Sequence, residues 1–317
     1  MRKVDMKTKK MLLAACAVLA ETLSATIVQW NFPRTGSCHE GLAFADGVTG
    51  VLAWGGGDTL NLTVGRGDLW DHRSGYPWTE DQSYSNIVSL VRSGQRAALL
   101  ALFRKETKPG QPRNPYMLPL GRVVVRVPGR TLKEGTLDTE TGLGRITFAE
   151  GGAVELAMSK ARRMFALRFS GVADWTSASV PATEQPVYWK YLRPWGFEKA
   201  TKVDGEVANV GGFRWNLPAD APVSLSWRKA DDVFCLTTGR NGDVACGPQD
   251  FATIAEESRD YWGRFWREGA RVKVPDPEIQ EIFDYGMYKF GAMTDPDGIP
   301  AGLQGQWLED DKLVPWN

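Results

Sequence analysis

The chain has 317 residues, with 38 Lys or Arg and 38 Asp or Glu, so its formal net charge is zero. That balance argues against a general nucleic-acid partner, which would call for a basic surplus or stripe. The length suffices for two domains or one large domain with a sizeable core. Thirteen Trp residues are a heavy aromatic load, and flat rings suit the apolar faces of sugars, although core packing explains most such rings.

Residues 1–25 have the pattern of an exported protein's signal peptide. The lysine-rich "MKTKK" at 6–10 precedes an apolar run at 11–20, and small residues follow up to Ala25. The apolar run is too short to cross a bilayer, so we expect no membrane span. "LAAC", ending at Cys16, also resembles a lipoprotein cleavage site, which is the alternative to a periplasmic or secreted product.

Residues 26–249 read as short strands separated by turns. "GVLAW", "TLNLTVG", "AALLALF", "GRVVVRV" and "RRMFALRFSG" are rich in apolar and β-branched residues. "RITFAEGGAVELAM" predicts a hairpin whose turn is Gly151 and Gly152. We therefore expect a mainly β fold built on a large antiparallel β-sandwich.

The hydrophobic period becomes helical after residue 249. Residues 250–272 predict a linker helix, and residues 273–317 begin a second domain. Its first helix opens with Asp276 as N-cap and Pro277 at the first helical position. A single helix cannot bury its apolar stripe alone, so this second domain looks unfinished.

The stretch from 53 to 73 is the most distinctive internal one. Its glycines at 55–57 lie between two strand-like runs and predict a hairpin turn, because no GK[ST] or helix follows as a phosphate loop requires. Asp68, Trp70 and His72 then gather at a strand end, either facing a sugar or neighbouring domain or forming a surface loop held by ion pairs. No cofactor is expected.

Cysteines and histidines leave one question open. Cys235 and Cys246 flank a turn and either form a disulfide or stay unbridged. The chain has no CxxC spacing and only two His, so no metal site is expected.

"LEDD" at 308–311 invites comparison with the paired carboxylates of glycosidases. Consecutive carboxylates on a loop are more often solvated or cap a helix. No catalytic residue can be assigned from the residues themselves.

Three stretches together resemble a known family. "GLAFADGVTGVLAWGGGDTLNLTVGRGDLWDHR", "SRDYWGRFWREG" and "DGIPAGLQGQWLEDDKLVPWN" are similar to the sandwich opening, the linker helix and the first barrel loop of glycoside hydrolase family 95, the α-L-fucosidase family. The family's Leu-Gln-Gly-x-Trp motif is matched by Leu303, Gln304, Gly305 and Trp307. One departure is Ala45-Asp46-Gly47, where relatives carry Gly-Asn-Gly.

The resemblance implies a sandwich followed by an (α/α)6 barrel whose mouth binds a terminal sugar of an oligosaccharide or polysaccharide. Gln304 and Trp307 would line the pocket by hydrogen bonding and stacking, with Asp68, Trp70 and His72 reaching it from the sandwich. Hydrolysis in the family inverts the anomeric centre, with a general acid and an activated water. The family places these catalytic residues after the point that corresponds to Asn317, so we expect an inactive fragment.

Two other functions stay open. The chain could be a non-catalytic glycan-binding or structural β-sandwich, which a natural end after the first helix would favour. It could also belong to a sugar phosphorylase of the same superfamily, which uses phosphate in place of water.

Overall fold

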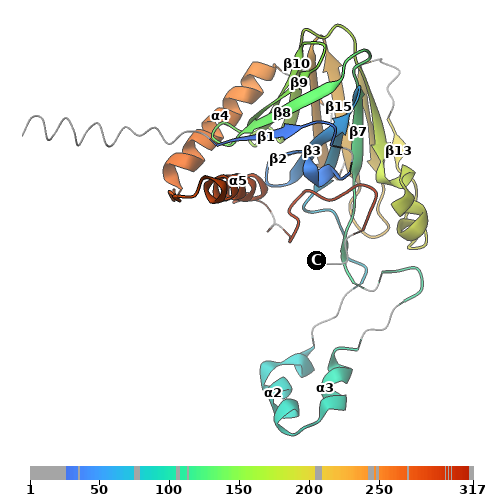
Figure 1. The fold of residues 1–317 in the computed structure, drawn as a ribbon. Coiled ribbons are helices and arrows are strands. Elements are labelled where there is room, and N and C mark those ends of the chain that lie inside the picture. Colours follow the sequence, from blue (N-terminus) through green and yellow to red (C-terminus); the bar gives the residue numbers. More distant parts are fainter. Residues whose placement is uncertain are drawn as a thin grey trace, which may run out of the picture.

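The computed structural model describes residues 26–34, 36–74, 79–104, 108–112, 114–203, 209–241, 246–247, 250–269, 271–296, 298, 300 and 302–313. The expected signal peptide and Cys16 lie outside these residues. Figure 1 shows antiparallel sheets stacked on each other, with two long helices at one end. The prediction of a mainly β fold with a large sandwich followed by helices is confirmed.

The larger sheet has nine antiparallel strands in the order β1-β8-β9-β10-β11-β16-β15-β14-β13. Their bounds are β1 Ile27–Asn31, β8 Leu132–Asp138, β9 Leu143–Phe148, β10 Ala153–Ser159, β11 Met164–Ser170, β13 Thr201–Lys202, β14 Val210–Trp215, β15 Val223–Ala230 and β16 Val233–Arg240. The β9–β10 turn has Gly151 at φ 86° and Gly152 at φ 85°, which confirms the predicted hairpin, since side-chain-bearing residues rarely adopt these angles.

The second sheet has five strands in the order β12-β7-β4-β3-β2. Their bounds are β2 Leu42–Ala45, β3 Thr49–Gly56, β4 Thr59–Arg66, β7 Gly121–Arg126 and β12 Thr176–Pro181, and a small separate pair joins β5 Trp70–Asp71 to β6 Tyr116–Met117. The predicted hairpin is present, but only the last glycine of the run at 55–57 lies in its turn: Gly55 and Gly56 end β3, and Gly57 with Asp58 makes the β3–β4 turn. Phe44 of this sheet packs on Phe165 of the larger one, with ring centroids 5.3 Å apart, so the two sheets share one core.

Helix α4, Phe251–Glu268, covers the outer face of the larger sheet. Ile254 and Ala255 pack with Ala157 and Ala166, which point away from the sandwich interior. Further along α4, Trp266 donates its indole N–H to the carbonyl oxygen of Thr139 at 2.7 Å. These contacts fix the helix predicted for residues 250–272 to the sheet.

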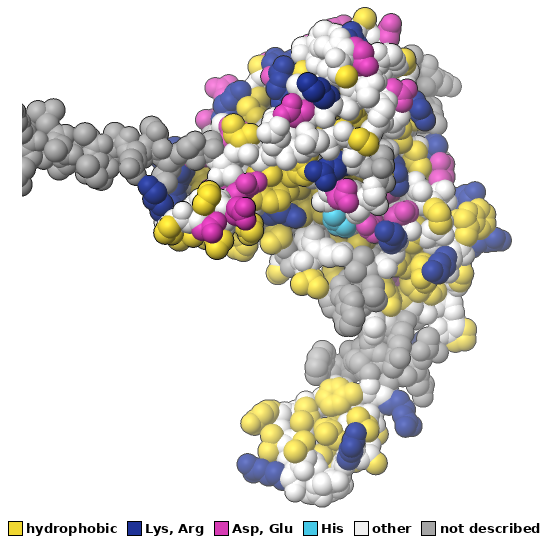
Figure 2. All heavy atoms as spheres, in the orientation of Figure 1, with side chains coloured by type: hydrophobic (Ala, Val, Ile, Leu, Met, Phe, Trp, Pro, Cys, Tyr) yellow, Lys and Arg dark blue, Asp and Glu magenta, His cyan; other side chains and the backbone are white. Residues whose placement is uncertain are grey.

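Helix α5, Pro277–Met293, begins where the sequence predicts. The Asp276 carboxylate accepts from the N–H groups of Glu278 and Ile279, as an N-cap does. Tyr288 stacks on Trp262 of α4, with ring centroids 4.4 Å apart. The opposite side of α5 leaves apolar side chains exposed, namely Ile279, Ile282 and Phe290. Yellow side chains gather along α5 in Figure 2.

One strand prediction is wrong. "AALLALF" belongs to helix α3, Arg96–Leu102, which pairs with α2, Tyr84–Arg92, in a helical hairpin. Ala and Leu favour helices and none of these residues is β-branched, so the segment forms a helix although it is apolar enough for a strand. Figure 1 shows this hairpin projecting away from the sandwich.

Short helical turns complete the described chain: η1 Cys38–Glu40, η2 Glu80–Gln82, η3 Ala182–Glu184 and the wider turn η4 Tyr188–Leu192. Among the described residues, none of the helices combines the length and apolar character that crossing a bilayer requires.

Candidate functional site

The segment 302–311 lies across strands β3 and β4 on three glycines, which we call the glycine platform: Gly50, Gly65 and Gly67. A Cβ atom on Gly65 would come within 2.2 Å of the Gln306 carbonyl oxygen, and one on Gly50 within 2.7 Å of the Gln306 Cβ. A Cβ on Gly67 would lie 3.3 Å from the Gln306 side-chain nitrogen. These strands lack side chains here because another backbone lies against them.

Gln306 fixes this segment to two other elements. Its side chain is fully buried, and its Nε2 donates to the carbonyl oxygens of Gly47 at 2.7 Å and Met293 at 3.0 Å. It thus joins the β2–β3 turn to the end of α5. Sequence reasoning missed this residue, because it occupies the unspecified position of the Leu-Gln-Gly-x-Trp motif.

The acidic run at 308–311 is only partly solvated, contrary to expectation. Asp310 is 2 % exposed and accepts two hydrogen bonds from the Arg122 guanidinium, at 2.5 and 2.8 Å. Burial raises the pKa of the Asp310 carboxyl, although the bonds and charge of Arg122 oppose this. The sequence gives no sign of this pair, since its partners lie on separate elements.

Trp307 belongs to the core and not to a pocket wall. Its side chain is 4 % exposed, and its Nε1 donates to the carbonyl oxygen of Phe44 at 2.9 Å. In this structure its ring offers no open face to a sugar. Gln304 is half-buried, and its carbonyl oxygen accepts from the Trp307 N–H at 3.4 Å.

The strand-end residue Asp68 forms a local ion pair, whereas His72 contacts a carboxylate from a distant part of the chain. Asp68 accepts two hydrogen bonds of 2.8 Å from Arg66. Partial burial alone raises the Asp68 pKa, but the hydrogen bond and charge of Arg66 outweigh it and hold the pKa below its usual range. His72 is exposed and lies 3.3 Å from the Asp220 carboxylate.

Trp70, by contrast, lies beside the 302–311 segment, which carries the other predicted site residues, Gln304 and Trp307. A Cβ atom on Gly302 would lie 3.6 Å from the Trp70 ring, whose Nε1 donates to the Gly67 carbonyl oxygen at 2.8 Å. The structure therefore brings Trp70 beside the 302–311 segment, whereas Asp68 and His72 turn to Arg66 and Asp220.

A cleft of about 380 Å³ opens where the β2–β3 turn and the β10–β11 turn meet α4 and the end of α5. We call it the charged cleft. Ligand sites in proteins have volumes of roughly 300–1,000 Å³, so its size suits a small ligand. The lining residues used below are Asp46, Lys160, Arg163, Glu257, Tyr261 and Asp295.

Two buried polar atoms of the charged cleft have no hydrogen-bond partner among the described residues: Oδ2 of Asp46 and Nη1 of Arg163. The other Asp46 oxygen accepts from the N–H groups of Val48 and Thr49, and the other Arg163 terminal nitrogen bonds Asp295 at 2.6 Å. Buried polar groups normally have partners. A hydroxyl group could satisfy both atoms, because it can donate to the Asp46 oxygen and accept from the Arg163 nitrogen.

Burial also raises the pKa of Asp46. The N–H groups of Thr49 and Val48 and the charge of Arg163 act in the opposite direction without cancelling it. The nearest Arg163 nitrogen lies 3.9 Å from the carboxylate, beyond hydrogen-bond reach. The carboxylate is therefore only partly compensated, but its side chain is fully buried, so a ligand can donate to it only if the surrounding turns shift.

Lys160 closes one side of the charged cleft and caps α5. Its Nζ donates to the carbonyl oxygens of Gly291 at 2.7 Å and Thr294 at 2.6 Å, and to the Tyr261 hydroxyl at 3.0 Å. A cation at a helix C-terminus satisfies carbonyls that lack partners and complements the helix dipole. Burial lowers the Lys160 pKa to about 8, although Asp46 and Asp295 oppose the shift.

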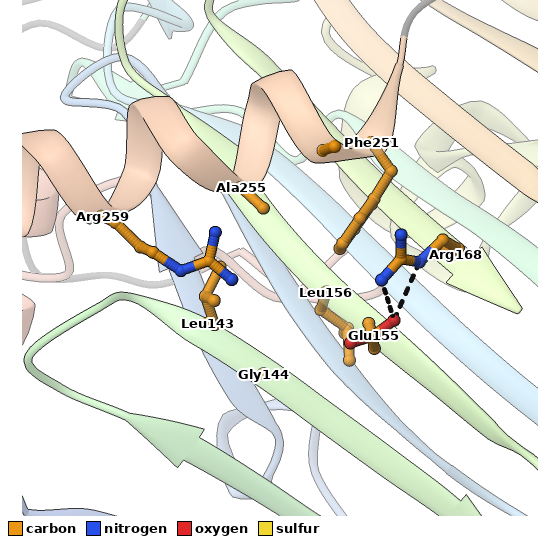
Figure 3. A pocket seen from close by; sticks show the side chains of 9 residues that line it. Leu143, Gly144, Glu155, Leu156, Arg168, Phe251, Ala255 and Arg259 are labelled. Carbon is orange, nitrogen blue, oxygen red and sulfur yellow. Dashed lines mark hydrogen bonds and ion pairs between the residues drawn. The ribbon is translucent and has the colours of Figure 1, made fainter. Parts of the chain in front are cut away.

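A second, smaller cavity of about 130 Å³ lies between the start of α4 and strands β9–β11 (Figure 3). Two of its ionic groups are paired with each other: Arg168 bonds Glu155 at 2.6 and 2.8 Å and lies 4.8 Å from the Phe251 ring centre. Its volume is below the usual range for ligand sites of roughly 300–1,000 Å³. The charged cleft is therefore the better candidate.

Cys235 and Cys246 are neighbours but are not bridged. Both are buried free thiols, and a hydrogen bond between them together with burial raises the pKa of Cys235. Of the two alternatives left open by the sequence, the structure has the unbridged pair.

No protein-family model matches the chain, and no curated protein sequence matches it.

Proposed function

We propose that this chain forms the sandwich and first barrel helix of an exported exo-glycosidase that removes terminal sugars, with α-L-fucose as the first candidate. The charged cleft carries the proposal. Its unpaired Asp46 oxygen and Arg163 nitrogen match a sugar hydroxyl, and the Tyr261 ring lies in the same wall. The cleft lies where the sandwich meets the helices, and junctions between structural units are frequent ligand sites.

The order of elements supports the family resemblance. An antiparallel sandwich is followed by α4 on its outer face and then by α5, as in an enzyme whose helical barrel follows a sandwich. The exposed Ile279, Ile282 and Phe290 give α5 a second apolar face. Further barrel helices would bury such a face.

Two of the stretches that resemble the family, the sandwich opening and the Leu-Gln-Gly-x-Trp loop, also contact each other in the folded chain. Gln306, inside the Leu-Gln-Gly-x-Trp motif, bonds the carbonyl oxygen of Gly47, which belongs to the opening stretch. The β2–β3 turn lies between Gln306 and the charged cleft, since Asp46 lines that cleft. The motif would thus position the turn that contacts the sugar.

We propose that the charged cleft binds a sugar but does not cleave a glycosidic bond. Inverting hydrolysis needs an acid and a base about 6.5–9.5 Å apart with a water between them. Here Asp46 is held by two backbone N–H groups, and Asp295 is paired with the same guanidinium that approaches Asp46. The resemblance assigns the acid and base to later barrel helices, so this chain alone is expected to bind sugar without turnover.

The test is a calorimetric titration of the pure chain with L-fucose, D-galactose, D-glucose and a fucosylated oligosaccharide. We expect saturable binding of one sugar class, weakened at least about tenfold in Arg163→Lys, because the shorter amine cannot keep both its Asp295 bond and the free donor. Arg168→Lys is the matched control, since Arg168 lies in the other cavity within a closed ion pair. No binding, or equal loss in both variants, would contradict the proposal.

Turnover measurements on the same chain separate the alternatives. Saturable release of fucose from an aryl α-L-fucoside would show that the chain is itself catalytic, against the proposal. Turnover that requires inorganic phosphate and yields a sugar phosphate would favour the phosphorylase. Absence of sugar binding by a well-folded chain would favour a structural sandwich.

A further inference from the structure

Three side chains with metal-binding atoms converge beneath the 302–311 segment. Cys38 and His39 belong to η1, and Glu309 comes from the far end of the described chain. The thiol sulfur, an imidazole nitrogen and a carboxylate oxygen all lie within 4.8 Å of one another. No metal is expected here from the sequence, because Cys38 and His39 are neighbours in the chain but the Glu309 carboxylate joins them only in the fold.

Ser37 holds two of the three groups in place. Its hydroxyl caps η1 by accepting from the His39 N–H at 3.3 Å, and it donates to the Oε1 oxygen of Glu309 at 3.1 Å. That oxygen is the one facing the His39 ring, at 4.0 Å from Nε2. Lys312 binds the other carboxylate oxygen at 2.9 Å, which leaves Oε1 directed toward Cys38 and His39.

We propose that Cys38, His39 and Glu309 form a binding site for a divalent transition metal, with Zn²⁺ as the best match. One sulfur, one nitrogen and one oxygen ligand are what Zn²⁺ accepts, whereas Ca²⁺ and Mg²⁺ take oxygen ligands. Three protein ligands leave the fourth tetrahedral position for water or another donor.

The geometry needs only a small adjustment. Sulfur, nitrogen and oxygen ligand atoms around tetrahedral Zn²⁺ are separated by roughly 3.3–3.6 Å, given metal–ligand distances of about 2.0–2.3 Å. The His39 side chain is 42 % exposed and can move to close the remaining gap, while Cys38 and Glu309 are more enclosed. Asp310, next to Glu309, already has Arg122 as its partner and does not compete for the ion.

Metal binding would tie the 302–311 segment to the sandwich. Cys38 and His39 precede β2, whereas Glu309 follows the residues that lie on the glycine platform. The ion would therefore add a link next to the Trp307 and Asp310 contacts. Because it binds only the folded chain, it would raise the melting temperature.

The experiment is a titration of the reduced, metal-free 317-residue chain with Co²⁺, followed by absorbance and by competition with Zn²⁺. We expect one equivalent, with the near-ultraviolet band of a cysteine thiolate–Co²⁺ bond and the visible bands of tetrahedral Co²⁺. Cys38→Ser should abolish the thiolate band. Ser37→Ala should weaken binding about 10- to 100-fold, as loss of a group that orients a ligand does.

Cys246→Ser and His72→Gln are the matched controls and should leave the spectrum unchanged, because neither residue belongs to the proposed site. A thiolate band that persists in Cys38→Ser and disappears in Cys246→Ser would move the site to the buried thiol pair and overturn the proposal. So would absence of any band in the native chain. If Cys38→Ser does not fold, Glu309→Gln decides: unchanged affinity in that variant overturns the three-ligand site.

Discussion

The indole N–H of Trp307 donates a 2.9 Å hydrogen bond to the carbonyl oxygen of Phe44, 263 residues earlier in the chain. Both side chains are buried in the core cluster that the two sheets share. The residue that the family resemblance places in a sugar pocket is therefore a structural anchor of this sandwich. It fixes the 302–311 segment to β2.

Removing that anchor is expected to cost stability. Trp307→Ala should lower the free energy of unfolding by about 3–5 kcal/mol through lost apolar contacts. Trp307→Phe should cost about 1–3 kcal/mol, mainly because the Phe44 carbonyl loses its donor. Urea denaturation measures both, with Trp189→Ala as a control because Trp189 is 53 % exposed. Full stability with lost sugar binding would instead make Trp307 a ligand residue.

The glycine platform gives a second stability prediction. Gly65→Ala would place a Cβ 2.2 Å from the Gln306 carbonyl oxygen, so the segment must shift. We expect a loss of about 1–3 kcal/mol, as for other overpacked sites. Gly286 is the control, because it lies in α5 with nothing within 4 Å of an added Cβ. Gly286→Ala should stabilise the chain by up to about 1 kcal/mol. Equal effects of the two variants in thermal unfolding would contradict the described packing.

The Arg122–Asp310 pair is expected to behave as a buried ion pair. Their side chains are 16 % and 2 % exposed, so Asp310→Ala leaves a guanidinium with little access to water. The expected cost is about 3–5 kcal/mol. The exposed Arg126–Asp58 pair, 3.9 Å apart, is the comparison, and Arg126→Ala should cost less than about 1 kcal/mol. Similar costs for both, measured by denaturant unfolding, would place Asp310 in solvent.

Because of Lys160, we expect the free energy of unfolding to rise at high pH. The pKa of Lys160 is about 8 in the folded chain, whereas that of an unperturbed lysine is 10.5. Between these values the unfolded chain binds more protons, so the free energy of unfolding increases with pH, by about 3 kcal/mol in total. Below pH 8 both states are protonated and the contribution is constant. The measurement is the stability of the native chain minus that of Lys160→Met from pH 7 to 11. A difference that stays flat or falls above pH 8 contradicts the lowered pKa.

Local patterns predict much of this fold from the sequence. Alternating apolar residues and glycine turns identify the β9–β10 hairpin, and Asp276 with Pro277 marks the start of α5. The failure at residues 97–103 has a local cause. That run is apolar enough for a strand, but its Ala and Leu residues favour a helix, and it lies in a hairpin outside the sandwich core.

The candidate sites are harder to predict because they depend on contacts between distant segments. Nothing near Asp310 in the sequence indicates Arg122, and nothing near Cys38 indicates Glu309. Asp46 is notable in the sequence only as a departure from the family pattern. Its unpaired oxygen beside Arg163 becomes visible only when the two turns are placed together.

The most direct measurement is a crystal structure of the chain soaked with the sugar that binds best. We predict a sugar ring in the charged cleft, with the two turns that line it shifted so that one hydroxyl lies about 2.7–3.2 Å from both the Asp46 Oδ2 and the Arg163 Nη1 atoms. A sugar bound elsewhere, such as on the exposed ring of Trp189, with only water between Asp46 and Arg163, would contradict the central claim.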